Sequence, residues 1–184
     1  MPRYVALLRG INVGGKNLIP MPALKTAFEE AGFRDVRTYI QSGNVVFAAP
    51  SSPQAELMGR IERMLRTSFD HYDASVVLRS RSQMRAIVER RPDRFGSEPT
   101  KCRYDVLFLK APLTAKTVIG TVPTKEGVDR IWPGNGVVYF SRLTARAVQS
   151  RLSRVVSMAI YQRMTIRNWN TTTKLLELLE ATDR

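Results

Sequence analysis

The order of strand-like and helix-like segments in the first half constrains the fold of this chain most strongly. Alternating β-branched residues predict strands, whereas apolar residues at i, i+3, i+4 and i+7 predict helices. The predicted strands are Arg3–Arg9, Asp35–Ile40, Val45–Phe47 and Ala74–Arg79. One helix separates the first two strands and opens at Pro20 and Pro22. Another separates the last two, with Ser52 as its cap and Pro53 at its first position. This β-α-β-β-α-β order is typical of a ferredoxin-like unit.

The second half repeats this order less clearly. A helix over Ser82–Arg91 and a polar stretch over Pro92–Lys101 separate the halves, which predicts domains at 1–91 and 92–184. The elements expected beyond are strands at Tyr104–Leu109, Gly127–Trp132 and Val137–Phe140, a short helix near Leu113–Ile119, a long helix marked by Val148, Leu152, Val155 and Val156, and a last helix at about Thr171–Ala181. The segment Gly43-Asn44-Val45-Val46-Phe47 is loosely echoed by Asn135-Gly136-Val137-Val138-Tyr139-Phe140. We therefore predict an α+β fold: two ferredoxin-like (βαββαβ) halves with antiparallel sheets, plus a C-terminal helix.

Positive charge dominates the composition. The chain has 29 Lys and Arg against 16 Asp and Glu, a net charge of +13. No acidic residue lies between Asp129 and Glu177, and we expect Arg146, Arg151 and Arg154 in this stretch to contact nucleic acid. A positive field attracts nucleic acid, anionic lipid headgroups or phosphorylated metabolites. The alternative is that these arginines only solvate an ordinary surface, because net charge sets non-specific affinity rather than function.

Cysteine use and hydropathy predict a cytoplasmic protein. The single cysteine, Cys102, excludes an intramolecular disulfide. Arg9 and Gly10 interrupt the N-terminal apolar segment, unlike in a secretion signal, and no apolar run approaches the length of a membrane span. We therefore expect no membrane partner.

A glycine-rich turn follows the first predicted strand. The segment Gly10–Lys16 has the G-x-x-x-x-G-K spacing of a phosphate-binding P-loop. Asn17 lacks the hydroxyl that would hold magnesium, and Pro20 and Pro22 place the next helix too late for such a loop. Two interpretations remain: backbone N–H groups of the turn bind some other anion, or the turn is structural.

A second polar motif, Thr165–Thr171, precedes the last predicted helix. A helix N-terminus leaves unpaired N–H groups and a partial positive charge. Arg167 has a planar fork that suits a carboxylate or phosphate, and Lys174 lies one turn into the helix, so the motif is a candidate anion site. The alternative is that its asparagines and threonines only satisfy caps and turns, while Trp169 packs in the core.

Few side chains offer acid–base chemistry or metal ligands. His71 is the only histidine, and Asp70 and Asp73 beside it do not complete a metal site. Cys102 lies between two cationic residues that would lower its pKa, but no paired histidine accompanies it. We therefore expect no metal and no cofactor. Whether the chain is an enzyme stays open, with binding favoured over catalysis.

Three ordered motifs carry a family resemblance. They are Leu7–Gly15, then Tyr39–Val45 with the polar cluster Gln41-Ser42-Gly43-Asn44 at a predicted hairpin tip, then Thr165–Thr171 with Lys174-Leu175-Leu176, and Ser150–Ser153 adds a fourth element. Together they resemble the bacterial domain-of-unknown-function family DUF1697, from Tyr4 to about Leu179. The resemblance implies two ferredoxin-like halves and no known activity.

If these motifs converge in the folded chain, their polar residues line one basic, amide-rich surface that binds an anion or other ligand. The residues concerned are Arg9, Asn12, Gly14, Gly15, Lys16, Gln41, Asn44, Arg167, Asn168 and Lys174.

Three functions fit the sequence. The first is a non-catalytic basic module that binds an anionic partner such as RNA or DNA; Tyr104 and Phe108 share a strand face, but no RNP motif accompanies them. The second is an enzyme or sensor that acts on a small phosphorylated or carboxylated metabolite. The third is an interaction domain whose basic helix, Thr144–Ile160, binds an acidic protein.

Overall fold

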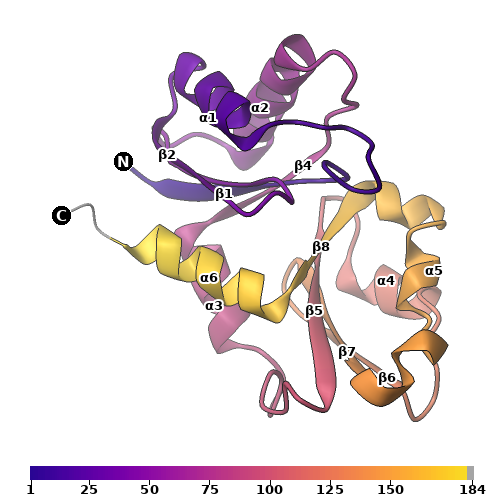
Figure 1. Ribbon diagram of the computed structural model, residues 1–184. Helices are drawn as coiled ribbons and strands as arrows, with labels where there is room; N and C mark the ends of the chain where they lie inside the picture. Colours follow the sequence, from indigo (N-terminus) through magenta and orange to yellow (C-terminus); the bar gives the residue numbers. More distant parts are fainter. Residues whose placement is uncertain (182–184) are drawn as a thin grey trace. The chain divides into compact units, whose positions relative to one another are not determined.

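The computed structural model describes residues 1–181, whose strands and helices are shown in Figure 1. They form two compact units: Met1–Arg85 with the segment from Lys174 onward, and Ala86–Thr173. Each unit contains a four-stranded antiparallel sheet, which confirms the predicted α+β fold. The domain boundary expected after residue 91 stays a prediction. No helix in the described residues is long and apolar enough to cross a membrane.

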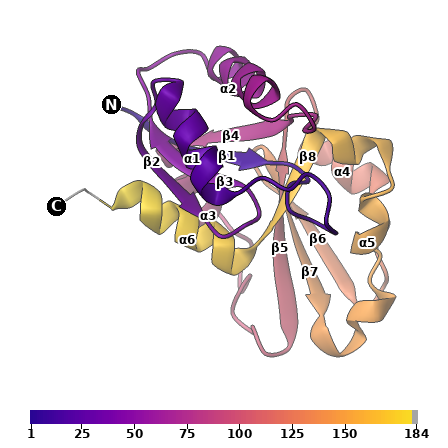
Figure 2. The ribbon, with the colours of Figure 1, turned by 45° about the horizontal axis from the view of Figure 1, so that its top comes forward.

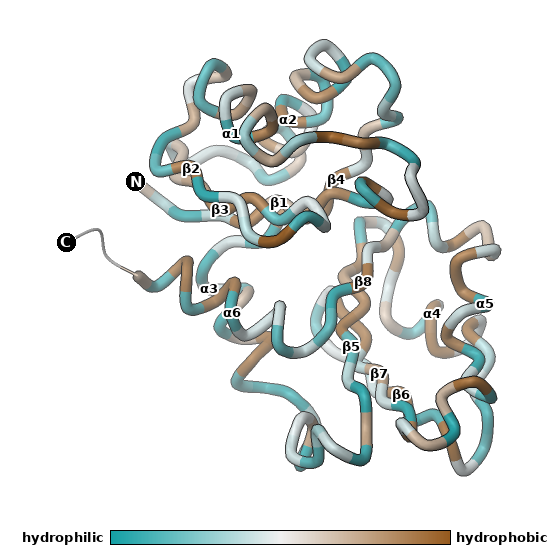
Figure 3. Tube along the Cα trace, in the orientation of Figure 1, coloured by the Kyte–Doolittle hydropathy of each residue, from teal (hydrophilic) through white to brown (hydrophobic). Residues whose placement is uncertain are grey.

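The first unit has the strand order β2-β3-β1-β4, with α1 and α2 on one face of the sheet (Figure 2). Its elements are β1 (Arg3–Leu8), α1 (Met21–Glu30), β2 (Arg34–Tyr39), β3 (Asn44–Ala48), α2 (Gln54–Ser68) and β4 (Val76–Ser80), followed by α3 (Arg81–Glu89). Hydrophobic and hydrophilic residues recur at helical spacing in α1 and α2 (Figure 3). The apolar positions of α1 pack on the sheet, where Phe28 lies 5.5 Å from Phe47 between ring centroids.

One helix start differs from the prediction. Pro53, rather than Ser52, is the N-cap of α2, and no side chain bonds to the first turn. Pro53 has an extended ψ of 132°, so the helix begins one residue later, at Gln54. The hydroxyl of Ser52 donates to the carbonyl of Pro50 instead, at 3.5 Å.

The second unit has the equivalent strand order, β6-β7-β5-β8. Its elements are β5 (Cys102–Leu109), α4 (Ala115–Thr121), β6 (Asp129–Pro133), β7 (Val137–Leu143) and β8 (Met164–Asn168), followed by α6 (Trp169–Glu180). β8 was not expected from the sequence, in which these residues belong to a polar motif before the last helix. Val118 of α4 and Leu152 and Val155 of α5 (Leu152–Val155) pack against the sheet.

The long helix predicted around Val148 is wrong. The structure has three short pieces there: the 3₁₀ helix η1 (Thr144–Gln149), α5, and the 3₁₀ helix η2 (Ala159–Arg163). Val148 is 96% exposed, so it is not part of an apolar stripe. The helical ladder is interrupted because the N–H of Leu152 donates to the hydroxyl of Ser150, and the N–H of Arg151 donates to the carboxylate of Asp129.

The register of the two sheets confirms the internal repeat. Leu8 N–H donates to the carbonyl of Gly43 in the first unit, and Leu109 N–H donates to that of Gly136 in the second. Tyr4 pairs with Phe47 and Ser80 in one sheet, and Asp105 pairs with Phe140 and Asn168 in the other. The two units can therefore be compared position by position.

Candidate ligand pocket in the second unit

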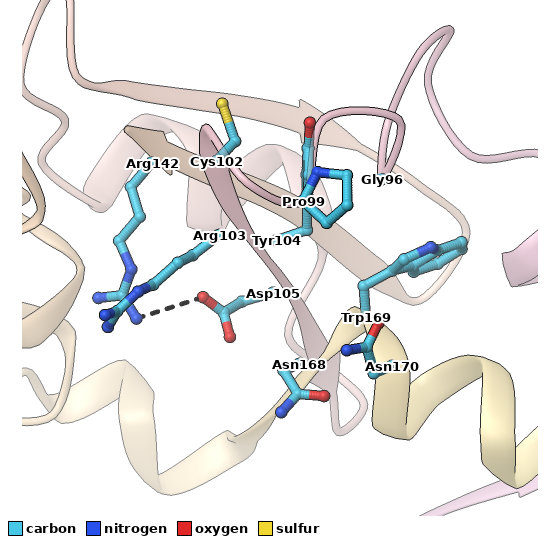
Figure 4. Close-up of a pocket in the computed structure, with 10 residues that line it drawn as sticks. All are labelled: Gly96, Pro99, Cys102, Arg103, Tyr104, Asp105, Arg142, Asn168, Trp169 and Asn170. Carbon is cyan, nitrogen blue, oxygen red and sulfur yellow. Dashed lines mark ion pairs between the residues drawn. The ribbon is translucent and has the colours of Figure 1, made fainter. Parts of the chain in front are cut away.

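A cavity of about 350 Å³ lies where β8 ends beside β5 (Figure 4). The last residue pair between the two strands is Asp105 with Asn168, so β5 has no neighbouring strand on that side from Cys102 to Tyr104. The chain turns at Asn168 into α6, and the loop that contains Gly96 and Pro99 forms another wall. The short partner strand leaves space that side chains only partly fill.

Asp105 and Arg142 lie inside this cavity on the same face of the sheet. Arg142 pairs with Arg103, two residues from Asp105 along β5, and side chains two apart on a strand share a face. Asp105 is 8% exposed, and its Oδ2 lies 3.6 Å from Nη2 of Arg142. Burial raises the pKa of the Asp105 carboxyl, while the charges of Arg142 and Arg103 oppose this rise.

The hydrogen-bonding groups of Asp105 and Arg142 are only partly satisfied. The separation of 3.6 Å exceeds the range of an N–H···O hydrogen bond. Oδ2 of Asp105 and Nε of Arg142 are both buried without a hydrogen-bond partner in the described part of the chain. Buried polar atoms without a partner are uncommon, and they call for a specific explanation.

Arg103 and two amides add further donors. Arg103 is exposed and forms no ion pair within the described residues, so two guanidinium groups face one carboxylate in this cavity. Asn168 caps α6, because its Oδ1 accepts from the N–H of Thr171 at 2.7 Å. Its Nδ2 is then left as a donor, and the exposed Asn170 lies two residues further along, in the first turn of α6.

Trp169 is a rigid wall of the cavity. Its ring packs edge-on against Phe95, 5.2 Å away between centroids, and Arg91 lies 5.9 Å from it. Gly96 approaches the indole so closely that a Cβ there would lie 2.5 Å from Nε1. A side chain at residue 96 would therefore displace Trp169.

The equivalent position in the first unit is closed and apolar. The register places Tyr4 where the second unit has Asp105, and Ala49 where it has Arg142. Tyr4 is 5% exposed and Ala49 1% exposed, and both belong to the hydrophobic core. The fold therefore does not require charged residues at these positions.

A second cavity, of about 360 Å³, lies beside the first in the same unit. Tyr104, Phe95 and Trp132 line it, together with Arg94 and Arg130. The phenol oxygen of Tyr104 accepts from the N–H of Glu98 at 3.2 Å, and burial raises its pKa. Phe108, which we considered with Tyr104 as a stacking surface, is completely buried and cannot stack on a base.

The glycine-rich turn closes a small hairpin. Val13 pairs with Lys16, whose N–H donates to the carbonyl of Val13 at 3.1 Å. Gly14 and Gly15 both have positive φ, as in two-residue hairpin turns, and no atom would lie within 4 Å of an added Cβ at either. Since α1 begins only at Met21, the segment does not have the geometry of a P-loop.

Several predicted ligands from the first unit bond to backbone atoms. The Asn12 amide donates to the carbonyls of Ile19 and Gln41 and accepts from the N–H of Ile19. Asn44 is completely buried and donates to the carbonyl of Tyr39 and the hydroxyl of Ser42. These bonds hold the glycine turn against the hairpin tip. Arg9 also has a backbone role, because its carbonyl accepts from the Tyr72 hydroxyl at 2.7 Å.

The residues predicted as ligands around the last helix have different environments in the structure. Asn168 lines the cavity, as do its neighbours Trp169 and Asn170. Arg167 is only 7% exposed, and its Nη1 donates to the Thr165 hydroxyl and the Ile166 carbonyl. Lys174 forms an ion pair with Glu177 at 2.8 Å, which raises its pKa. Convergence of all ten predicted ligands on one surface stays a prediction.

The three arginines expected to bind nucleic acid lie between β7 and β8. Arg146 and Arg154 are exposed, and Arg151 is half-buried. Nη2 of Arg146 donates to Gln149 at 2.9 Å. His71 is exposed near Asp70, and no cluster of three metal-ligating side chains occurs in the residues described.

Sequence reasoning missed Arg103, Asp105 and Arg142 as a group. Asp105 and Arg142 are 37 positions apart, and only the pairing of β5 with β7 brings them together. One signal was present: Asp105 is the only charged residue in the predicted strand Tyr104–Leu109.

The fold and the cavity define a duplicated ferredoxin-like protein with a polar pocket in its second repeat. The chain belongs to the family described as protein of unknown function (DUF1697), whose model matches residues 1–139. The third motif of the resemblance, at Thr165–Thr171, lies outside that match.

Several solved structures match the chain. The conserved bacterial protein SP0830 from Streptococcus pneumoniae is 27% identical, with a TM-score of 0.85 over 97% of this chain and 99% of that one. An unknown protein from Galdieria sulphuraria is 12% identical over 91% of this chain and 96% of that one, with a TM-score of only 0.25. No curated protein matches the chain.

Proposed function

We propose that the chain is a non-catalytic binding protein for a small anionic metabolite, phosphorylated or carboxylated, which it holds in the cavity beside β5. The observation that carries this proposal is the replacement of the core residues Tyr4 and Ala49 of the first unit by Asp105 and Arg142 in the second. Both residues face a cavity of ligand size.

Energetics support a binding role over a structural one. Removing two charges from water costs several kcal/mol for each ion, and replacing a buried ion pair by apolar residues is often neutral or stabilising. The first unit has core residues, Tyr4 and Ala49, at the equivalent positions. The charged pair is therefore explained better by a ligand than by the fold.

Binding is favoured over catalysis by the groups in the cavity. Tyr104 has a raised pKa, so it stays protonated near neutral pH. Asp105 is held close to Arg142, and His71, the only histidine of the chain, is not among the residues that line the cavity. Cys102 also lines the cavity. Because neither a histidine nor a second carboxylate of the described residues lines the cavity with these groups, the set is better suited to bind and orient charge than to transfer a proton.

A thermal-shift experiment tests the proposal. A ligand that binds only the folded state stabilises it by about 2.7 kcal/mol at 100 times its Kd, which corresponds to roughly 5–10 °C for a chain of this size. The probes are inorganic phosphate, ethyl phosphate, propionate and citrate. Arg103→Ala is expected to reduce the shift, and Arg146→Ala, the matched control outside the cavity, is expected to retain it in full. Equal shifts in both variants, or none with the wild-type protein, contradict the proposal.

A nucleic acid is the second candidate partner. The second unit has fifteen Lys and Arg against six Asp and Glu, and Arg146 and Arg154 are exposed on it. Each phosphate contact adds about 0.7 to the slope of log affinity against log salt for a single strand. We expect the double variant Arg146→Ala/Arg154→Ala to lower that slope by about 1.4, measured by fluorescence anisotropy with a labelled oligonucleotide.

The control for this experiment removes two exposed arginines from the first unit, in the variant Arg34→Ala/Arg63→Ala. Both double variants lose the same net charge. If they weaken binding equally, the affinity comes from overall charge and the segment between β7 and β8 is not an interface.

A further inference from the structure

Asp105 is an unexpected residue for a site that binds a simple anion. A carboxylate beside two guanidinium groups repels the ligand that they attract. Figure 4 shows the carboxylate between the arginines and Asn168, with one oxygen directed at Arg142. A ligand that places only negative charge in this cavity would lie against a negative wall.

From this arrangement we infer that the ligand is zwitterionic: its phosphate or carboxylate binds Arg103 and Arg142, and a primary ammonium group binds Asp105. This inference rests on the proposed function and names the ligand class for the same site. The class includes amino acids and phosphorylated amino alcohols.

The geometry of the ion pair supports this assignment. A carboxylate has about four acceptor positions, and Oδ2 of Asp105 is buried without a hydrogen-bond partner among the described residues. If Asp105 only neutralised Arg142, a two-pronged contact of about 2.7–2.9 Å would be expected. The observed distance is 3.6 Å, and the buried Nε of Arg142 is left without a partner. The two groups therefore do not satisfy each other, and a zwitterion would bond to the parts of the side chains that stay exposed, 12% of Asp105 and 23% of Arg142.

The size of the cavity fits the same class. About 350 Å³ is near the lower end of ligand pockets, which run from roughly 300 to 1,000 Å³. The cavity therefore suits a compact ligand whose opposite charges lie a few atoms apart.

Matched pairs of probes test the inference by calorimetry. In each pair the anion is the same and only the amine differs: 2-aminoethyl phosphate with ethyl phosphate, and β-alanine with propionate. We expect the aminated member to bind wild-type protein at least about tenfold more tightly, as is typical of a hydrogen bond to a charged group. Asp105→Asn is expected to reduce this preference to less than threefold without weakening the amine-free probes.

Arg103→Ala is the second variant, because Arg103 is exposed and its removal leaves Asp105 in place. It should weaken all four probes while the preference for the amine is retained. Equal affinities of aminated and amine-free probes for the wild-type protein overturn the inference and leave the proposed function intact. If none of the four probes binds, the proposed function fails for this chemistry, and the inference fails with it.

Discussion

Replacing Asp105 and Arg142 together by apolar residues should not destabilise the protein. At 3.6 Å the attraction between the two charges amounts to about 4–5 kcal/mol at an effective dielectric constant near 20. The cost of desolvating two ions is several kcal/mol each, so the net contribution is near zero or unfavourable. The raised pKa of Asp105 points the same way, because burial outweighs the attraction of both arginines for its charge.

For Asp105→Leu/Arg142→Met we therefore expect an increase of about 1–2 kcal/mol in the free energy of unfolding, within the 1–4 kcal/mol found for such replacements. This corresponds to roughly 2–8 °C in Tm for a chain of this length. Arg142→Met alone should lower stability, because Asp105 is then buried without its cation, whereas Asp105→Leu alone should cost less, because Arg142 is only half-buried.

Urea unfolding of all four proteins, followed by far-ultraviolet circular dichroism, gives the coupling energy of the pair. Because the chain has two compact units, a second probe such as tryptophan fluorescence must give the same transition before two-state values are used. A loss of more than about 1 kcal/mol in the double variant would refute the reasoning, since the pair would then be structural.

Other predictions concern the same residues and the turns around them. Asp105→Asn should be more stable than wild type at pH 7, because the raised folded-state pKa of Asp105 means that its ionisation destabilises the native state. The difference in stability should disappear as the pH falls through that pKa toward the unfolded-state value. Urea midpoints at pH 3.5–7 measure this difference. Gly43→Ala should cost about 2–4 kcal/mol in thermal unfolding, since its φ is +77° and a Cβ would lie 2.7 Å from Ile11, whereas Gly15→Ala, with a φ of +72° and open space, should cost only about 1 kcal/mol. Asn168→Ala should cost about 1 kcal/mol through loss of the α6 cap.

The sequence predicted the repeated order of strands and helices because each element carries its own periodicity. The spacing of Leu24, Ala27 and Phe28 is enough to orient α1, and the structure confirms it. The segment around Val148 failed for the opposite reason. Its apolar residues have helical spacing, but the N–H groups of Arg151 and Leu152 donate to the carboxylate of Asp129 and the hydroxyl of Ser150, which ends the helical pattern. The spacing of apolar residues gives no sign of such bonds.

The candidate site was less predictable than the fold. The sequence pointed to polar motifs with many asparagines as candidate sites. In the structure, however, the side-chain amides of Asn12 and Asn44 form hydrogen bonds with backbone groups of the first unit. Short polar side chains at turns do this commonly, so abundance of amides is a weak sign of a binding site. Asn168 is the exception, because its amide caps a helix and still faces a cavity.

Because the chain contains two similar repeats, residues at equivalent positions of the two can be compared directly. Ser80 and Asn168 occupy equivalent positions at the ends of β4 and β8, and both cap the following helix: Ser80 with Gln83 and Asn168 with Thr171. The caps are the same in function because both repeats need them to begin a helix there. Asp105 and Arg142 have no such counterpart in the first unit, although the surrounding register is the same. What the two repeats share is therefore explained by folding, and the charged pair that only the second repeat has is where a ligand should be sought.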